Sequence, residues 1–378
     1  MSNKIRTFYN IYPDTRSKDL MKPNGLIPYT LVHDFNYLAT IVTYDNDDNY
    51  NDPNIEGVNV DFLKKYFNNP IIDGCLYLMK NAKKIDILHT FFWKKENYFW
   101  FFVYKLFNKN GKIYVTIDAD ERIKRDEMIN KGIKGKVKKY FLSKCTLIST
   151  ETRDIYNWMK KNWYPEIKYI PYGVLPPKEE VSYENKENVI ITVGRIGTYQ
   201  KANEILLEGF KKAYPKLKKW KLKLIGPVEK EFNKYLDEFF DNNPELRKSI
   251  ELTGPIYDRK LLNDEYNKAK IFCLTSRYES FGLVLSEAAS RGCYLISSEI
   301  APAKDLTDNE KYGSLFKMED SDDLAEKLIE VCNQEKKLRN NCTEIQKFIN
   351  KNFTWNVVCK KALTYLGEFN GNKYKKDK

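Results

Sequence analysis

The chain has 378 residues, more than one ordinary domain holds, and fits two domains of roughly 150–200 residues each. Hydrophobic residues make up 42% of it, enough to build cores, which excludes a generally disordered chain. The 64 Lys and Arg outnumber the 52 Asp and Glu and give a net charge of +12. Such an excess suits nucleic acid, acidic membrane surfaces or phosphorylated ligands as partners.

The seven cysteines are scattered and form no Cys-x-x-Cys pair, which predicts reduced core thiols of an intracellular protein. His33 and His89 are the only histidines, so a His-rich metal site is excluded. The chain begins without the apolar region of a signal peptide. The apolar run Tyr98–Phe107 is far shorter than the ~18 residues of a membrane span and predicts a buried helix. We therefore expect a cytoplasmic location.

Two stretches are strongly basic. Arg122–Lys144 holds nine basic residues against Asp126 and Glu127, and Lys211–Lys223 holds seven Lys and no acid. Each stretch is either a solvated helix face and loop, or a binding patch. If a stretch is a binding patch, the partner that we consider is an anionic membrane surface.

Short β-type runs alternate with helical patterns along the whole chain, which is typical of parallel sheets covered by helices. In the first half we expect strands at Ile5–Ile11, Leu38–Tyr44, Ile85–Thr90, Lys112–Ile117, Cys145–Ser149 and Lys168–Pro171. Helices are expected there at Tyr98–Phe107 and Thr152–Lys161. The segment Leu175-Pro176-Pro177 and the polar residues up to Glu187 read as a linker.

A second series of elements begins at Asn188. Strands are expected at Val189–Val193, Lys221–Ile225, Ile250–Thr253, Ile271–Thr275 and Tyr294–Ser297. Helices are expected at Ala202–Tyr214, Lys230–Phe240, Asp258–Ala269, Leu283–Ser290 and Asp322–Val331. The sequence therefore predicts an α/β protein with two doubly wound domains, 1–177 and 188–354, and a C-terminal helix at about 355–370 that packs back on the first. Ligands of such sheets bind beyond the carboxyl ends of the strands.

The segment Leu274–Gly292 carries the clearest chemical signal. A strand ends near Thr275, a loop holds Glu279, and a helix begins around Gly282 or Leu283. The amides of Phe281, Gly282 and Leu283 would then be available to an anion at the helix start. Ser280 lies in the same loop.

Glu279 and Glu287 are two carboxylates beside this expected anion site. A carboxylate accepts hydrogen bonds from sugar hydroxyls, so Glu279 is a candidate for the transferred sugar and Glu287 for a ribose. The alternative is that Glu279 caps the helix and Glu287 lies on the surface.

A second segment, Val193–Lys201, follows the first strand of the second domain. Gly194, Arg195 and Lys201 lie at a strand-to-helix turn, where two fixed cations would neutralise a diphosphate leaving group, as Mg²⁺ does elsewhere. A solvated Arg and Lys are the alternative.

These motifs resemble those of the GT-B glycosyltransferases of family 4, the glycosyl transferases group 1. The resemblance is dense from about Val189 to Leu328 and rests on Gly194-Arg195 with Lys201, Leu224-Ile225-Gly226-Pro227, Leu252-Thr253-Gly254-Pro255-Ile256, Ser276–Leu283 with Glu287-Ala288, and Gly313-Ser314-Leu315-Phe316. The first half matches in outline only, at Asp86–His89 and Tyr169–Val174.

The resemblance implies a retaining enzyme of GT-B architecture that needs no metal and no cofactor, and that moves a sugar from a nucleotide-diphosphate sugar, with UDP as a guess. Arg195 and Lys201 would bind the diphosphate, Glu279 the sugar, and Glu287 the ribose. The base would lie near Gly254, Ile256 and Tyr257. The implied acceptor is a glycan, a lipid-linked glycan or a protein, in cell-surface polysaccharide or glycoconjugate synthesis.

In the first domain the resemblance is looser. The glycine loop after the first strand corresponds to Lys22-Pro23-Asn24-Gly25, with one Gly where two are common. Where relatives often have a His near the acceptor, this chain has Asp118-Ala119-Asp120. Asp118 or Asp120 either serves the acceptor or caps the next helix, and His89 either faces the ligand side or lies in the core.

Three rivals remain. A nucleotide-sugar epimerase of the same architecture needs the same diphosphate clamp. A basic nucleic-acid or anionic-surface binding protein would bind in a salt-dependent manner, but no nucleic-acid recognition motif supports it. The third is a catalytically idle scaffold of this fold.

Overall fold

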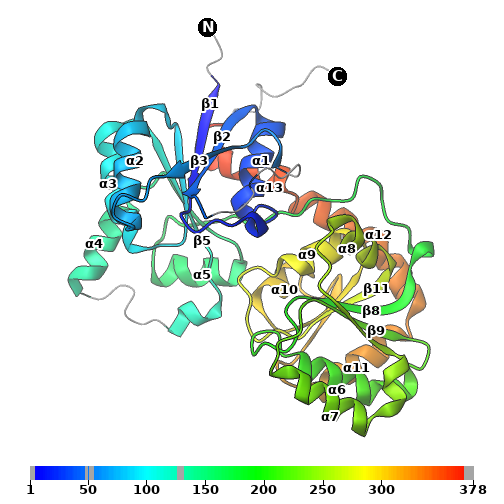
Figure 1. Cartoon of the computed structure of the whole chain (residues 1–378). Coiled ribbons are helices and arrows are strands. Elements are labelled where there is room, and N and C mark those ends of the chain that lie inside the picture. Colours follow the sequence, from blue (N-terminus) through cyan, green and yellow to red (C-terminus); the bar gives the residue numbers. More distant parts are fainter. Residues whose placement is uncertain (1–4, 47–49, 51–54, 126–131, 370–378) are drawn as a thin grey trace. The chain divides into compact units, whose positions relative to one another are not determined.

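The computed structural model describes residues 5–46, 50, 55–125 and 132–369 (Figure 1). It divides into two compact units. The first comprises Met1–Gly173 and Trp355–Lys378, and the second comprises Val174–Thr354.

A seven-stranded sheet forms the centre of the first unit, and all its strands run parallel in the order β3-β2-β1-β4-β5-β6-β7. Its strands are β1 (Arg6–Ile11), β2 (Tyr37–Tyr44), β3 (Asn59–Leu63), β4 (Ile87–Phe91), β5 (Lys112–Ile117), β6 (Leu147–Thr150) and β7 (Lys168–Tyr169). The central strands are buried on both sides, as expected of a parallel sheet covered by helices.

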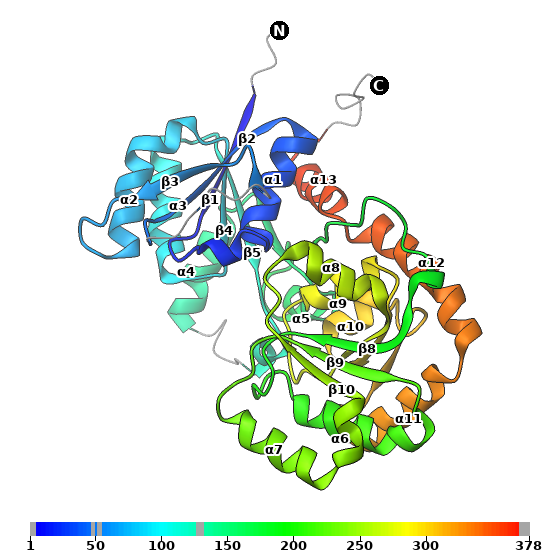
Figure 2. The same cartoon turned by 45° about the vertical axis from the view of Figure 1, so that its right-hand side comes forward.

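Helices cover both faces of this sheet. They are α1 (Pro23–Phe35), α2 (Pro70–Asn81), α3 (Lys95–Phe107), α4 (Gly132–Leu142), α5 (Arg153–Asn162) and α13 (Trp355–Tyr365). Figures 1 and 2 show α2 and α3 on one side of the sheet and α1 with α13 on the other. The C-terminal segment is tied to this unit through Glu368, which forms ion pairs with Arg6 and Lys112.

A six-stranded parallel sheet forms the centre of the second unit, in the order β10-β9-β8-β11-β12-β13. Its strands are β8 (Glu187–Val193), β9 (Lys221–Ile225), β10 (Ile250–Gly254), β11 (Ala269–Leu274), β12 (Tyr294–Ser298) and β13 (Gly313–Phe316). Its helices are α6 (Asn203–Ala213), α7 (Phe232–Asn242), α8 (Arg259–Lys268), α9 (Leu283–Ser290), α10 (Ala301–Leu306), α11 (Ser321–Cys332) and α12 (Glu335–Asn352).

The two sheets share one topology. In each sheet the order reverses beside the first strand, between β1 and β4 in the first unit and between β8 and β11 in the second. This doubly wound order confirms the predicted fold class, and ligands of such sheets bind at the carboxyl ends of the strands beside the reversal.

The polar segment expected to be a linker belongs to the second unit. The side chain of Gln346 accepts a hydrogen bond from the Val181 amide and donates one to the Val181 carbonyl, both at 2.9 Å. Tyr183 is buried. The segment is therefore attached to α12 through Val181, while its polar residues Lys178, Glu179 and Glu180 are exposed.

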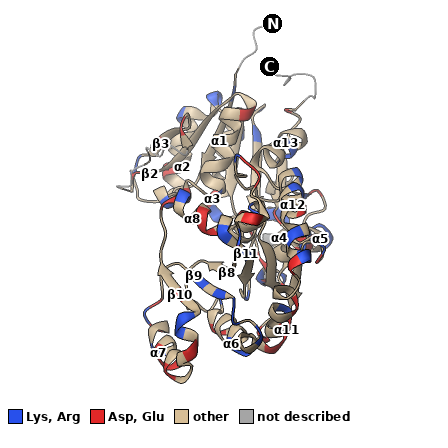
Figure 3. Cartoon of the chain, turned by 90° about the vertical axis from the view of Figure 1, so that its right-hand side faces the viewer, with Lys and Arg blue, Asp and Glu red and all other residues tan. Residues whose placement is uncertain are grey.

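The basic stretch Lys211–Lys223 follows the solvated alternative, because three of its lysines are paired with carboxylates and Lys216, Lys218, Lys219 and Lys221 are exposed to solvent. Lys211 bonds to Glu208, Lys212 to Asp322 at 2.7 Å and Lys223 to Glu265 at 2.7 Å. Figure 3 shows basic and acidic residues interspersed around α6 and α7. Of the other stretch, residues 126–131 lie outside the described residues.

Candidate functional site

The motifs of the second unit meet at the point where its sheet order reverses. β8 ends at Val193 and its neighbour β11 ends at Leu274. The loops that follow carry Gly194–Lys201 and Thr275–Glu279. Because parallel neighbours end at the same edge of the sheet, segments almost 80 residues apart in sequence come together there.

The glycine turn after β8 is packed tightly against the next strand end. The Gly194 amide donates to the Ile225 carbonyl at 2.9 Å. Gly226 has φ 146°, and a Cβ at this position would lie 1.8 Å from the Gly194 carbonyl oxygen. Only glycine fits there. Gly226 therefore allows the close approach of the turn that carries Gly194 and Arg195.

Lys201 and Glu279 form an ion pair at the centre of this edge. Lys201 Nζ lies 2.5 Å from Glu279 Oε1, and the side chains are only 15% and 11% exposed. The Ser276 hydroxyl donates to the same carboxylate oxygen at 2.8 Å, and the Thr275 hydroxyl donates to the Lys201 carbonyl at 2.8 Å. Glu279 therefore does not cap α9; its carboxylate is bound to the cation of the opposite loop.

Arg277 joins the two loops and was not singled out in the sequence. Its amide donates to the Gln200 carbonyl at 2.8 Å. Its guanidinium bonds to Glu204 at 2.7 Å and Glu319 at 2.5 Å, and lies 4.2 Å from the centre of the Tyr199 ring. These bonds hold the Lys201 loop against the Glu279 loop, so Arg277 is a positioning residue.

Arg195 contrasts with Lys201. Its side chain is exposed, and it makes no ion pair or side-chain hydrogen bond with any residue that the structure describes. The edge thus presents one cation held by a carboxylate and one that is available to an incoming anion.

The start of α9 completes this side. Gly282 is the residue before the helix, with φ 69° and ψ 62°, a left-handed conformation that favours glycine. Gly282 has no side chain that could accept hydrogen bonds from the amides of the first turn. These amides can therefore donate hydrogen bonds to an anionic ligand. Phe281 is buried against Phe353, which anchors the turn, while Ser280 and Leu283 are half-buried.

Glu287 lies in the second turn of α9 and is held by α8. Its two oxygens accept hydrogen bonds from Arg259 at 2.9 Å and from the Tyr266 hydroxyl at 3.1 Å. The alternative of a free surface residue is wrong, because the carboxylate is only 15% exposed and doubly bonded. Each oxygen keeps a lone pair for a further donor.

The residues expected near a base lie at the end of β10. Gly254 has φ 73° with open space at its Cβ position, Ile256 is half-buried and the Tyr257 ring is almost fully exposed. An exposed aromatic ring beside an open glycine offers a flat apolar surface, which suits stacking against a planar base.

In the first unit a pocket of about 190 Å³ opens at the corresponding edge. Its lining combines residues after β1, β4 and β5 with the start of α1: Tyr12, Asp14, Asp19, Lys22, Pro23, Asn24, Phe91, Phe92, Asp118 and Tyr172. Phe92 has φ 61°, which is strained for a bulky residue. Such strain is found most often at functional sites.

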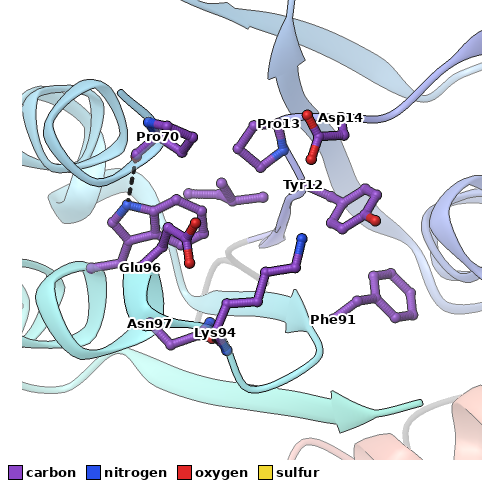
Figure 4. A pocket seen from close by; sticks show the side chains of 10 residues that line it. Tyr12, Pro13, Asp14, Pro70, Phe91, Lys94, Glu96 and Asn97 are labelled. Atoms are coloured by element: carbon purple, nitrogen blue, oxygen red, sulfur yellow. Dashed lines mark hydrogen bonds between the residues drawn. The ribbon is translucent and has the colours of Figure 1, made fainter. Parts of the chain in front are cut away.

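A second, smaller hollow adjoins this pocket, because both are lined by Tyr12, Asp14 and Phe91 (Figure 4). Figure 4 shows Lys94 extending beside Tyr12, and its Nζ lies 4.9 Å from the centre of that ring. Aromatic rings and carboxylates thus line one continuous edge of the first sheet.

The two aspartates after β5 have different surroundings. Asp118 is half-buried and lines the pocket. Asp120 instead accepts hydrogen bonds from the Arg122 amide and guanidinium. Partial desolvation alone would raise the pKa of Asp120, but the hydrogen bonds and the positive charge of Arg122 together outweigh it and lower the pKa. Asp120 therefore follows the capping alternative, and Asp118 alone faces the pocket.

His89 lies in the core and not on the ligand side, which corrects its placement among acceptor-side candidates. It is fully buried between the rings of Phe8, Phe91 and Tyr114, and its Nε2 lies 3.0 Å from the Thr116 hydroxyl. Burial lowers the pKa of His89 to about 3.

Gly25 also differs from the expected loop. It lies in the first turn of α1, which begins at Pro23. A Cβ at Gly25 would lie 2.0 Å from the Leu20 carbonyl oxygen. Gly25 therefore allows the chain before α1 to approach the helix, and the residues ahead of it, Lys22 to Asn24, line the pocket.

Glu151, at the end of β6, is a buried carboxyl that the sequence analysis missed. It is fully buried, and its carboxyl accepts hydrogen bonds from the Ala119 amide at 2.8 Å and from the Thr150 hydroxyl at 3.2 Å. Burial raises the pKa of Glu151 well above its usual range, and the charge of Asp118 adds to the shift. Glu151 therefore fixes the loop that carries Asp118.

This shift predicts a pH-dependent effect of Glu151→Gln on stability. In the unfolded chain the carboxyl ionises near its ordinary pKa, but in the folded chain only well above it, so the folded state loses stability as pH rises past the unfolded value. Glutamine removes this loss. We expect the change in the free energy of unfolding caused by Glu151→Gln to be more favourable at pH 8 than at pH 4, by on the order of 1 kcal/mol or more. Chemical denaturation at both pH values measures it, and an equal effect at both would contradict a neutral Glu151.

Among the described residues, no group of three or more His, Cys, Asp or Glu side chains is arranged to hold a metal ion. Within the same part of the chain, no helix combines the length and the apolar character that crossing a membrane requires.

Comparison with known proteins shows what the second unit is similar to. The model of the family described as glycosyl transferases group 1 matches residues 177–347. A probable sucrose-phosphate synthase of Thermosipho melanesiensis is 27% identical over 216 residues, which are 55% of this chain and 49% of that protein. The chain spans less than half the length of the curated relatives it matches.

Solved structures match the whole fold. A glycosyltransferase from Rickettsia africae superposes with a TM-score of 0.72 at 16% identity, over 98% of this chain and all of that one. HepE of Anabaena, solved in complex with UDP and glucose, gives a TM-score of 0.69 at 13% identity, over 96% and 100%. The chain therefore has the GT-B fold, and its residues 177–347 are similar to the family described as glycosyl transferases group 1.

Proposed function

We propose that this protein is a metal-independent, retaining glycosyltransferase that takes a sugar from a nucleotide-diphosphate sugar. The observation that carries the proposal is the pairing of Lys201 with Glu279 beside the available Arg195, at the reversal point of the second sheet. The similarity of this unit to the group 1 family supports transferase chemistry, and the UDP bound by HepE supports UDP as the nucleotide.

The residues have distinct roles in this reaction. As the bond from the anomeric carbon to the diphosphate stretches, negative charge builds on the leaving group, and fixed cations lower the barrier. Arg195 would clamp the diphosphate and Lys201 would share its three donors between that group and Glu279. The remaining lone pairs of Glu279 would accept hydrogen bonds from hydroxyls of the transferred sugar. Those of Glu287 would accept hydrogen bonds from the ribose hydroxyls.

The pocket of the first unit is the proposed acceptor site. Sugar rings present apolar faces and hydroxyl edges, which suit the aromatic rings of Tyr12 and Phe92 beside the carboxylates of Asp14 and Asp118. Asp118 would orient the acceptor hydroxyl. The acceptor is then a glycan or a lipid-linked glycan.

Donor choice and metal independence are tested by thermal shift. UDP-, GDP- and ADP-sugars are each added with and without EDTA. A donor at 100 times its Kd adds about 2.7 kcal/mol of stability, and the shift should persist in chelator. A shift that EDTA abolishes contradicts the cation clamp.

Product analysis separates transfer from its rivals. Transfer releases free nucleotide only when an acceptor is present, and the product keeps the anomeric configuration of the donor. A new nucleotide sugar without an acceptor would indicate an epimerase.

A further inference from the structure

The first unit exposes an apolar surface on two neighbouring helices that the transfer reaction does not use. On α3 the exposed side chains are Phe99, Phe102 and Leu106, and on α4 they are Ile133, Val137 and Tyr140. We call these six residues the α3–α4 face. Soluble surfaces rarely group large apolar side chains in this way, and such groups mark interaction sites.

The face is continuous because the two helices touch. The ring of Tyr98 on α3 packs edge-on against Phe141 on α4, with centroids 5.0 Å apart, and Figures 1 and 2 both show α3 and α4 as neighbours on one side of the sheet. On α3 the exposed residues recur at intervals of three and four, opposite the buried Trp100, Phe101 and Tyr104. This helix is therefore apolar on both sides, and its inner side already fills the core.

Lysines accompany the apolar residues. Lys95 on α3 and Lys136 and Lys139 on α4 are exposed, and none of them forms an ion pair with a residue that the structure describes. Exposed lysines without an ion pair to any described residue also occur in the second unit, for example Lys218 and Lys219, so it is the combination with the exposed apolar side chains that distinguishes the α3–α4 face.

From this combination we infer that the α3–α4 face binds the surface of an anionic lipid bilayer. Apolar side chains that enter the headgroup region beside unpaired lysines are the pattern of helices that lie on membranes. A second copy of the chain is a poorer occupant, because the lysines of two such faces would repel each other. The inference goes beyond sugar transfer, since it concerns where the enzyme acts and not what it does.

Vesicle flotation of the full chain tests the inference. We expect binding to vesicles of phosphatidylcholine with phosphatidylglycerol, weaker binding at high salt, and little binding to phosphatidylcholine alone. Absence of binding to the anionic vesicles at low salt would overturn the inference.

Two pairs of variants locate the binding surface. Lys136→Glu with Lys139→Glu should lower the affinity for anionic vesicles by roughly tenfold or more. The matched control, Lys218→Glu with Lys219→Glu, makes the same change in net charge at exposed residues of the second unit and should bind nearly as the wild type does. Equal losses in both would show attraction by net charge alone and refute a specific face.

The apolar residues are tested in the same way. Phe102→Ser with Leu106→Ser should reduce flotation, whereas Leu38→Ser with Leu261→Ser, also exposed, should not. Circular dichroism verifies folding, and the donor-induced thermal shift should be unchanged in all variants, which separates this inference from the proposed function. If sedimentation velocity shows a dimer that depends on Phe102 and Leu106, the face binds a second copy and the membrane inference is wrong.

Discussion

Arg195→Ala is expected to lower the turnover of sugar transfer roughly 100- to 1,000-fold and to leave the thermal unfolding midpoint unchanged. The side chain is exposed and has no ion pair with any described residue, so its removal strands no partner and opens no cavity. Its proposed contact forms as charge develops on the diphosphate, and the loss of one such donor raises the barrier by about 2.7–4 kcal/mol.

Steady-state kinetics with a saturating donor distinguish the role of Arg195. A fall in kcat with little change in KM indicates a contact made in the transition state, whereas a rise in KM alone indicates uniform donor binding. Arg195→Lys should recover part of the rate, because it keeps the charge but loses the two-pronged geometry. Arg247→Ala, another exposed arginine of the second unit, is the control. Turnover within a few-fold of the wild type in Arg195→Ala would contradict the assignment.

The buried strands could be predicted closely from the sequence. Lys112–Ile117 and Lys221–Ile225 have the expected bounds, as does the helix Leu283–Ser290. Lys112–Ile117 is an almost wholly buried apolar run, whereas Lys221–Ile225 alternates Lys with apolar residues, and both patterns are typical of strands.

Other elements escaped prediction for physical reasons. The edge strand β3 carries Asn59 and Asp61 and is only partly buried, so it lacks an apolar signal. Helix α1 includes Pro23, Gly25 and Pro28, which locally favour turns, and only tertiary packing makes it a helix.

Within the site, residue types could be predicted but their partners could not. Arg195, Lys201, Glu279 and Glu287 stand out by their places beside strand ends and glycines. The bond between Lys201 and Glu279 joins residues 78 positions apart, and the bonds of Glu287 to Arg259 and Tyr266 depend on how α8 packs against α9. Glu151 gives no signal in sequence, because nothing in its neighbours shows that its carboxyl is buried.

The ion pair between Lys201 and Glu279 predicts opposite outcomes for stability and catalysis. Lys201→Met strands a carboxylate that is 11% exposed, and Glu279→Gln strands an ammonium that is 15% exposed. Breaking a buried pair from one side costs about 3–5 kcal/mol, so each single variant should unfold at clearly lower denaturant concentration. Since the double variant leaves no unpaired charge, it should regain most of this loss.

The double variant should regain stability but not turnover. If Lys201 stabilises the leaving group and Glu279 holds the sugar, the double variant lacks both contacts, and its kcat should stay at least roughly 100-fold below the wild type. Denaturation and initial rates on the same four proteins form a double-mutant cycle for each property. A double variant that regained both stability and turnover would show that the pair merely joins two loops. Stability that returns without turnover would support direct contacts of Lys201 and Glu279 with the reacting ligand.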